Sequence, residues 1–171
     1  MRPGRRAGPG RLALLAAAAG LACAGLAGCA GAVAGTGKAP AVCAQAGSIT
    51  RLVIHRVNGL PQNHERFSFP ALITVTSARR AQSVAQALCA LPLMPPGTFS
   101  CPNDWGISYR LTFATTARRF APVTAEISGC QVVHGLGAVR WTLTSPGFWR
   151  TLAQAAGITP ADEAVFRGTM P

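Results

Sequence analysis

The chain has 171 residues, of which 49% are hydrophobic and 12% charged, and its formal net charge is +11 at pH 7. This length is typical of one domain. The sequence has no basic run with interleaved aromatic residues, and we therefore expect no nucleic-acid partner. The positive charge can draw a protein to acidic lipids or polymers, or it can simply reflect arginine-rich coding.

The N-terminus has the layout of an export signal. Four arginines, ending at Arg11, precede an apolar stretch from Leu12 to Leu26. These 15 residues are fewer than the roughly 20 that a transmembrane helix needs. The pattern predicts a signal peptide over residues 1–28, with an uncleaved anchor helix as the alternative. The pair Arg5-Arg6 leaves both general secretion and twin-arginine export open.

The end of this stretch, Leu26-Ala27-Gly28-Cys29, resembles the lipobox of bacterial lipoproteins. The resemblance implies cleavage between Gly28 and Cys29, a diacylglyceryl group on the Cys29 thiol, and acylation of the new N-terminus. Several acyl chains hold a protein on a membrane stably, whereas one does so only marginally. We therefore expect a protein anchored by lipid on the extracytoplasmic face of the cell membrane, with 143 residues after cleavage and a net charge of +7.

Residues 29–48 follow as the acceptor cysteine and a flexible tether, rich in Ala and Gly, and one domain is expected over 49–171. Four cysteines remain after Cys29, and in an exported protein they predict two disulfides with three possible pairings. We favour Cys101–Cys130, which would clip one end of a hairpin, and Cys43–Cys89, which would tie the tether to a helix. No Cys-x-x-Cys occurs, which argues against zinc.

Alternating and β-branched residues predict five strands, over 51–57, 69–76, 107–113, 123–130 and 138–144. Helical spacing predicts a helix capped by Ser77 that runs to about Ala90, and a second one that opens at Ser145-Pro146 and ends at Gly157. A last short helix begins near Thr159-Pro160 and stops at Gly168.

The order β-β-α-β-β-β-α-α, with one apolar face on every strand, predicts an α+β domain in which helices cover one face of an antiparallel sheet. In the last strand, Val139, Trp141 and Leu143 would point inward. The uncovered face would be rich in threonine and mildly basic, and it would carry Arg51, His55, Thr74, Thr76, Ser108, Arg110, Thr112, Thr124, Glu126, Arg140, Thr142 and Thr144.

Groups for acid–base catalysis are scarce, because only five acidic residues occur in the whole chain. Glu126 can pair with Arg110 across a hairpin, and Asp162 and Glu163 are typical of a helix start. The motifs of serine hydrolases, phosphate-binding loops and zinc proteases are absent from the sequence. We therefore expect no enzyme activity, no catalytic residues, no metal and no cofactor.

The densest cluster of polar and aromatic residues is Cys101-Pro102-Asn103-Asp104-Trp105-Gly106. One interpretation is a rigid loop that presents Asn103, Asp104 and Trp105 to a partner. The interpretation that we favour is structural: Asp104 forms a side-chain turn, Gly106 permits a tight backbone, and Trp105 packs on a disulfide.

Two family resemblances arise at this loop. The stretch from Leu88 to Trp149 is similar to a group of actinobacterial lipoproteins of uncharacterised function, on the residues Leu91, Pro92, Cys101, Pro102, Asp104, Gly106, Tyr109, Leu111, Phe113, Gly129 and Cys130. The order of strand, strand, helix, Cys-Pro loop and hairpin resembles the Streptomyces subtilisin-inhibitor family. That resemblance implies a protease-binding loop after Cys101-Pro102, with Asn103 as the specificity residue and Asp104 after the scissile bond.

The sequence therefore favours a non-enzymatic lipoprotein that binds an envelope or secreted protein, through the sheet face with Arg110 and Arg140 or through the loop at Asn103. A subtilisin-inhibitor-like protease inhibitor is one alternative. A solute-binding or envelope-associated enzyme is another.

Overall fold

The computed structural model describes residues 40–60, 62 and 66–168, all of which belong to one compact unit over 37–171. Strict alternation of apolar and polar residues builds one of its two longest strands. In β3 (Ile107–Ala114), every second side chain from Ile107 to Phe113 is buried and those between are more exposed. A strand of this kind needs a covered face and an uncovered one.

The described strands form a single sheet in which every neighbouring pair is antiparallel. Its order is β2-β1-β3-β4-β5-β6, and the other strands are β1 (Arg51–Asn58), β2 (Leu72–Val75), β4 (Val123–Glu126), β5 (Val132–His134) and β6 (Arg140–Trp141). The predicted α+β class with an antiparallel sheet is confirmed, with six strands rather than five.

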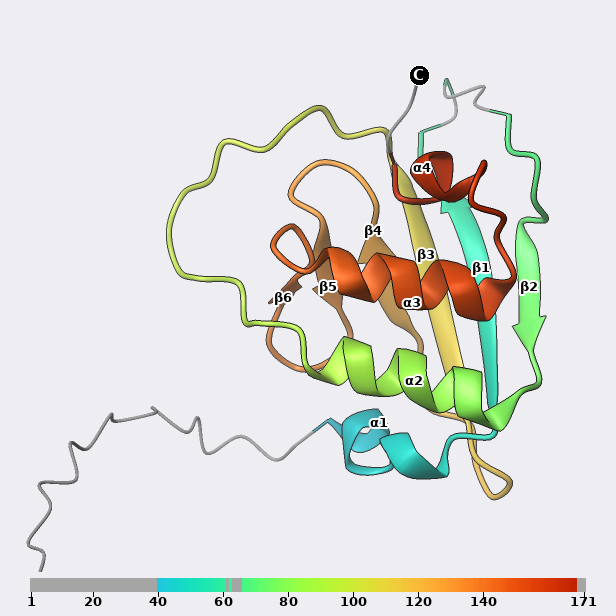
Figure 1. Ribbon diagram of the computed structural model, residues 1–171. Helices are drawn as coiled ribbons and strands as arrows, with labels where there is room; N and C mark the ends of the chain where they lie inside the picture. The colour runs from blue at the N-terminus through green and yellow to red at the C-terminus, as the bar shows by residue number, and fades with distance from the viewer. Residues whose placement is uncertain (1–39, 61, 63–65, 169–171) are drawn as a thin grey trace, which may run out of the picture. The chain divides into compact units, whose positions relative to one another are not determined.

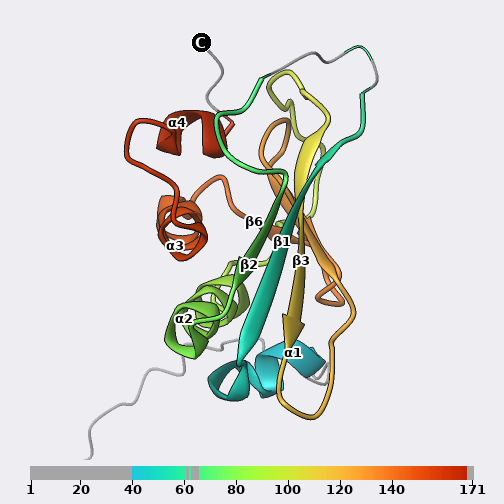
Figure 2. The same cartoon turned by 90° about the vertical axis from the view of Figure 1, so that its right-hand side faces the viewer.

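Helices α2 (Ala78–Cys89), α3 (Pro146–Ala156) and α4 (Glu163–Phe166) all lie on one side of the sheet (Figures 1 and 2). The Ser77 hydroxyl caps α2 by accepting the N–H of Arg80 at 3.5 Å, as predicted. Proline opens α3, and Gly157 ends it in the left-handed conformation with φ of 73°. None of the helices within the described residues is long and apolar enough to span a bilayer.

An aromatic cluster joins the helices to the sheet. The ring of Tyr109 stacks on Phe166 of α4 at 4.5 Å between centroids, and Trp149 of α3 lies 6.3 Å from the same tyrosine. The Tyr109 hydroxyl donates to the carbonyl of Phe166 at 3.2 Å. Burial raises the pKa of this phenol, although the nearby Arg56 opposes the shift. Tyr109 therefore fixes α4 as a neutral hydrogen-bond donor.

The fold begins before the expected domain start. Short helical turns, α1 (Ala41–Ala44) and the 3-10 helix η1 (Ala46–Ser48), occupy the end of the predicted tether. Val42 is buried and Cys43 is bonded to Cys89 of α2, so this segment is part of the domain.

Both favoured cysteine pairs, Cys43–Cys89 and Cys101–Cys130, are formed. Their sequence separations of 46 and 29 residues correspond to about 4 kcal/mol of stabilisation each in the loop-entropy model.

The sheet side without helices, here called the open face, is visible on the right of Figure 2. The register fixes its members, because residues directly opposite on neighbouring strands share a face. They are Arg51, Val53, His55 and Val57 of β1, Leu72 and Thr74 of β2, Ser108, Arg110 and Thr112 of β3, Thr124 and Glu126 of β4, Val132 and His134 of β5, and Trp141 of β6. At the β6 edge the ring of Phe99 packs against Trp141, with 5.5 Å between centroids.

The predicted faces of strand 138–144 were wrong. Only Arg140 and Trp141 form β6, and Arg140 lies opposite the buried Val133, which places it on the helix side. Thr142 is buried at 1% exposure and Leu143 is exposed at 47%, the reverse of the expectation. A two-residue ladder is too short for alternation to continue beyond it.

Candidate functional site

The Cys-Pro loop is held to the fold by the side chain of Asp104. Its Oδ1 accepts the N–H of Gly106 and the hydroxyl of Ser128, each at 2.8 Å. The buried Ser128 hydroxyl oxygen in turn accepts the N–H of Trp105 at 2.9 Å. Asp104 therefore makes the predicted side-chain turn. Its Oδ1 is thus engaged by two donors within the domain, which favours the structural interpretation over a recognition role.

The backbone of Asn103 is turned toward the same segment. Its carbonyl accepts the N–H of Gly129 at 3.3 Å, beside the Cys101–Cys130 disulfide. A serine protease takes the carbonyl of the specificity residue into its oxyanion hole. The carbonyl of Asn103 faces its own scaffold instead, so the geometry gives the inhibitor interpretation no support. The Asn103 side chain is exposed, and Trp105 is 39% exposed.

Arg110 lies near the centre of the open face. The register aligns Arg110 with His55 on β1 and Thr124 on β4. The same row continues to Leu72 on β2 and to His134 on β5. Arg110 is exposed, and no carboxylate of the described residues lies within ion-pair distance of it. This guanidinium is therefore available to a ligand.

The sequence suggested that Glu126 pairs with Arg110, and the structure shows a different partner. The register places Glu126 opposite Ser108, whereas Arg110, two residues further along β3, lies opposite Thr124. The carboxylate of Glu126 lies 3.5 Å from Nε2 of His134. Burial raises the pKa of Glu126, while His134 lowers it and Asp104 raises it further. The missed strand β5 supplies His134. Its sequence signal is the pair Val132-Val133 between turn glycines 129 and 135.

Arg140, the other predicted binding arginine, has a structural position. Its Nη1 donates to the carbonyls of Leu91 at 2.6 Å and Cys89 at 3.2 Å, at the C-terminal end of α2. Free carbonyls at a helix end are commonly satisfied by a basic side chain. The predicted pairing of Arg110 and Arg140 on one surface is therefore wrong, and only Arg110 remains a candidate.

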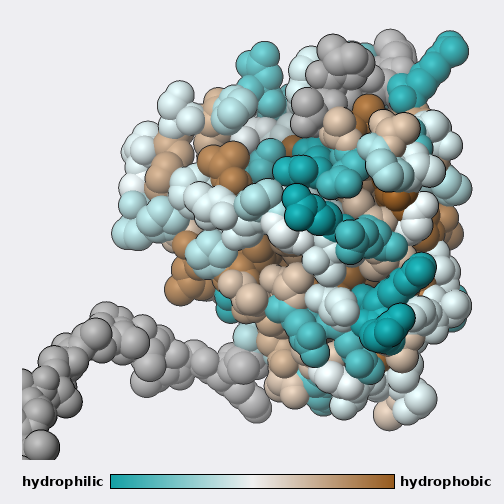
Figure 3. Space-filling view, in the orientation of Figure 1, coloured by the Kyte–Doolittle hydropathy of each residue, from teal (hydrophilic) through white to brown (hydrophobic). Residues whose placement is uncertain are grey.

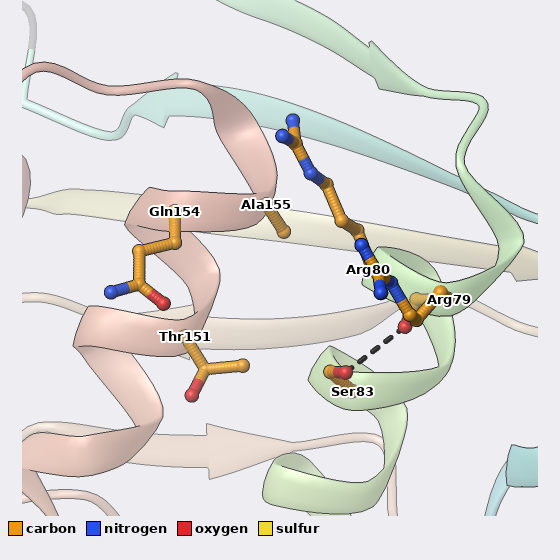
Figure 4. A pocket seen from close by; sticks show the side chains of 6 residues that line it. All are labelled: Arg79, Arg80, Ser83, Thr151, Gln154 and Ala155. Atoms are coloured by element: carbon orange, nitrogen blue, oxygen red, sulfur yellow. Dashed lines mark hydrogen bonds between the residues drawn. The ribbon is translucent and has the colours of Figure 1, made fainter.

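A hollow of about 290 Å³ lies between α2 and α3 (Figure 4). It is lined by Arg79, Arg80, Ser83, Thr151, Gln154 and Ala155. The two hydroxyls donate to carbonyls of their own helices, Ser83 to Arg79 at 3.0 Å and Thr151 to Gly147 at 2.9 Å. The hollow therefore offers mainly arginine donors.

A second hollow, of about 360 Å³, runs between the edge strand β2 and the turn after α3. Asp162 at its rim accepts hydrogen bonds from Ser68 and Thr159, and these lower its pKa. Within the described ranges no three His, Cys, Asp or Glu residues are grouped so as to hold a metal ion.

The lipid acceptor Cys29, the cleavage point after Gly28 and the signal peptide over 1–28 lie outside the residues that the structure describes. Comparisons with family models, with curated proteins and with solved structures found no match.

Proposed function

We propose that this chain is an extracytoplasmic lipoprotein, anchored through Cys29, whose domain binds a protein or another component of the cell envelope through the open face. The observation that carries the proposal is the side of the six-stranded sheet without helices, with the exposed Arg110 near its centre, which forms no ion pair with a described carboxylate. The N-terminal lipobox pattern supports the anchor.

The size and composition of the open face suit a binding surface. The six strands have 8, 4, 8, 4, 3 and 2 residues in chain order, and at about 4.8 Å between strands and about 3.4 Å per residue they give a face of roughly 470 Å². A standard protein interface buries about 800 Å² on each partner. The face also mixes an exposed Leu72 with half-buried Val53 and Val57 around an arginine, and arginine is enriched at interface centres.

The two disulfides support the extracytoplasmic location, because such bonds persist in oxidising compartments and are rare in the cytosol. The scarcity of carboxylates supports binding rather than catalysis. Three of the four acidic residues in the described ranges accept hydrogen bonds or pair with His134, and the fourth, Glu163, lies 3.7 Å from Arg167 on the same helix.

Two experiments test the proposal. Cys29→Ala should move the protein from the membrane fraction to the soluble fraction of the producing cells, and an unchanged distribution would contradict the anchor. For binding, Arg110→Ala should abolish in-cell crosslinking to the dominant partner without changing the thermal midpoint of unfolding. The matched control is Arg150→Ala on α3, which removes an exposed arginine from the helix side. Equal loss in both variants would contradict a role for the open face.

A further inference from the structure

The described acidic residues are confined to one end of the strands, whereas arginines occur at both ends and five of the eleven described arginines gather at the end without acids. Five exposed arginines, here called the arginine end, lie where β1 starts and β3 finishes: Arg51, Arg79, Arg80, Arg118 and Arg119. Arg51 lies opposite Ala114, the last residue of β3, and Ala114 bridges to Arg119 in the following loop. The end of β2 is paired with the start of β1, which brings the first turn of α2 to the same end, where Arg79 and Arg80 line the hollow between α2 and α3 (Figure 4).

The four described acidic residues are all at the other end of the strands. Asp104 binds the N–H of Gly106, just before β3 starts, and Glu126 is opposite Ser108. Asp162 and Glu163 belong to the α4 region, which is fixed to Tyr109 through Phe166. The eight residues of β1 separate the two ends by roughly 25 Å. This exceeds the Debye length of about 8 Å at physiological salt, so the acids barely offset the arginine end.

Among the residues that the structure describes, no carboxylate neutralises the arginine end. None of its five side chains forms an ion pair with a described carboxylate. Arg118 packs its guanidinium over the ring of Phe120 at 4.4 Å, which leaves its charge uncompensated. Hydrophilic residues gather over the N-terminal part of α2, at the lower right of Figure 3. Arg79 and Arg80 lie in the first turn of that helix, where the helix dipole favours negative charge. An anion bound there would be stabilised both by the arginines and by the dipole.

The chain enters the fold at this same end. Pro40 leads into α1 and η1, which run directly into the start of β1, and Gln82 of α2 donates to the carbonyl of Ile49 at 3.0 Å. Figures 1 and 2 both place α1 beside this end of the sheet. Eleven residues from Cys29 to Pro40 can span at most about 40 Å. A lipid on Cys29 would therefore hold the arginine end near the membrane.

We propose that the arginine end docks on the anionic phospholipid headgroups of the membrane that holds the anchor. Guanidinium groups bind phosphate oxygens through paired hydrogen bonds, and each basic residue near an anionic bilayer strengthens binding about fivefold. Because one end of the strands faces the bilayer, the strands of the docked domain point away from the membrane, and the open face points sideways, accessible to a partner. This inference rests on the lipid anchor of the proposed function.

The test uses the chain from residue 29 with Cys29→Ser, which keeps every described element and removes the lipid. Its sedimentation with vesicles of neutral phosphatidylcholine is compared with that of vesicles containing phosphatidylglycerol, at low and at high salt. We expect binding only to the anionic vesicles, and loss of that binding at high salt. Binding that is equal on both vesicles, or absent from both, would overturn the proposal.

Two triple variants separate position from net charge. Replacing Arg51, Arg118 and Arg119 by glutamine should weaken binding to anionic vesicles more than 100-fold, from about fivefold per residue. Replacing the exposed Arg66, Arg110 and Arg150 by glutamine removes the same charge elsewhere and should weaken it less than tenfold. Equal losses would overturn the proposal.

Two further measurements complete the design. The double variant of Arg79 and Arg80 to glutamine should lose about 25-fold and serves if the first triple variant does not fold. Binding of the chain to heparin but not to anionic vesicles would assign the arginine end to a soluble polyanion and overturn the membrane as its occupant. The protein in these vesicle assays carries no lipid. A failure to bind anionic vesicles would therefore not affect the fractionation test of Cys29, and the two proposals can fail separately.

Discussion

Replacing Arg140 by alanine should destabilise the domain strongly, although the residue is only half-buried. The variant loses two hydrogen bonds from a charged donor, to the carbonyls of Leu91 and Cys89, and leaves both carbonyls at the end of α2 without that donor. Hydrogen bonds from charged groups contribute about 1.5–3 kcal/mol, and the 3.2 Å bond should lie at the weak end of that range. We therefore expect a loss of about 3–4.5 kcal/mol in the free energy of unfolding.

Urea denaturation with the disulfides intact measures this loss. With a slope of about 2 kcal/mol per molar urea, the midpoint should fall by roughly 1.5–2 M. Arg140→Lys keeps the charge but not the planar guanidinium group, so its urea midpoint should lie between those of the alanine variant and the wild type. Arg110→Ala is the control. Because Arg110 is exposed, its replacement should change the free energy of unfolding by no more than about 0.5 kcal/mol. A midpoint for Arg140→Ala equal to that of the control would refute the capping role.

Other substitutions test other contacts. Tyr109→Phe leaves the buried carbonyl of Phe166 without its donor and should cost about 1–2 kcal/mol in urea denaturation; no change would argue against a role in fixing α4. Gly168→Ala should lower the thermal midpoint by the equivalent of about 2 kcal/mol or more, because φ is +84° and the new Cβ would meet the Ile127 carbonyl; an unchanged midpoint would contradict this. Asp162 has a lowered pKa in the fold, so its stabilisation is present above about pH 4 and is lost as the pH falls through the folded pKa. Asp162→Asn should therefore be less stable than wild type at neutral pH, and unfolding curves should converge in acid; a constant difference would count against the assignment.

Much of the fold could be predicted, because its central elements carry strong periodic signals. The strand at 107–113 alternates without a break, and the helix after Ser145-Pro146 has both a start signal and a terminal glycine. The prediction was less accurate where elements are short. Strand β5 has three residues and β6 has two, so neither shows enough alternation to fix its face. The placement of Arg140 was wrong for this reason.

The candidate site was predicted only in part. The register that separates Glu126 from Arg110 and joins it to His134 depends on where β5 pairs, which no local pattern specifies. The turn made by Asp104 was foreseen from residue type, but its bond to Ser128, 24 residues away, needs the folded hairpin. The arginine end likewise arises from three separate segments, and only the strand pairing shows that they meet.

The most direct test of a binding role for the open face is site-specific photocrosslinking in the anchored protein. A photoreactive amino acid replaces Thr112 on the open face or, as the control, the exposed Gln86 on α2. We expect one dominant adduct from position 112, lost when Arg110→Ala is added, and no such adduct from position 86. Identical adducts from both positions, or an adduct at 112 that survives Arg110→Ala, would contradict a binding role for the open face.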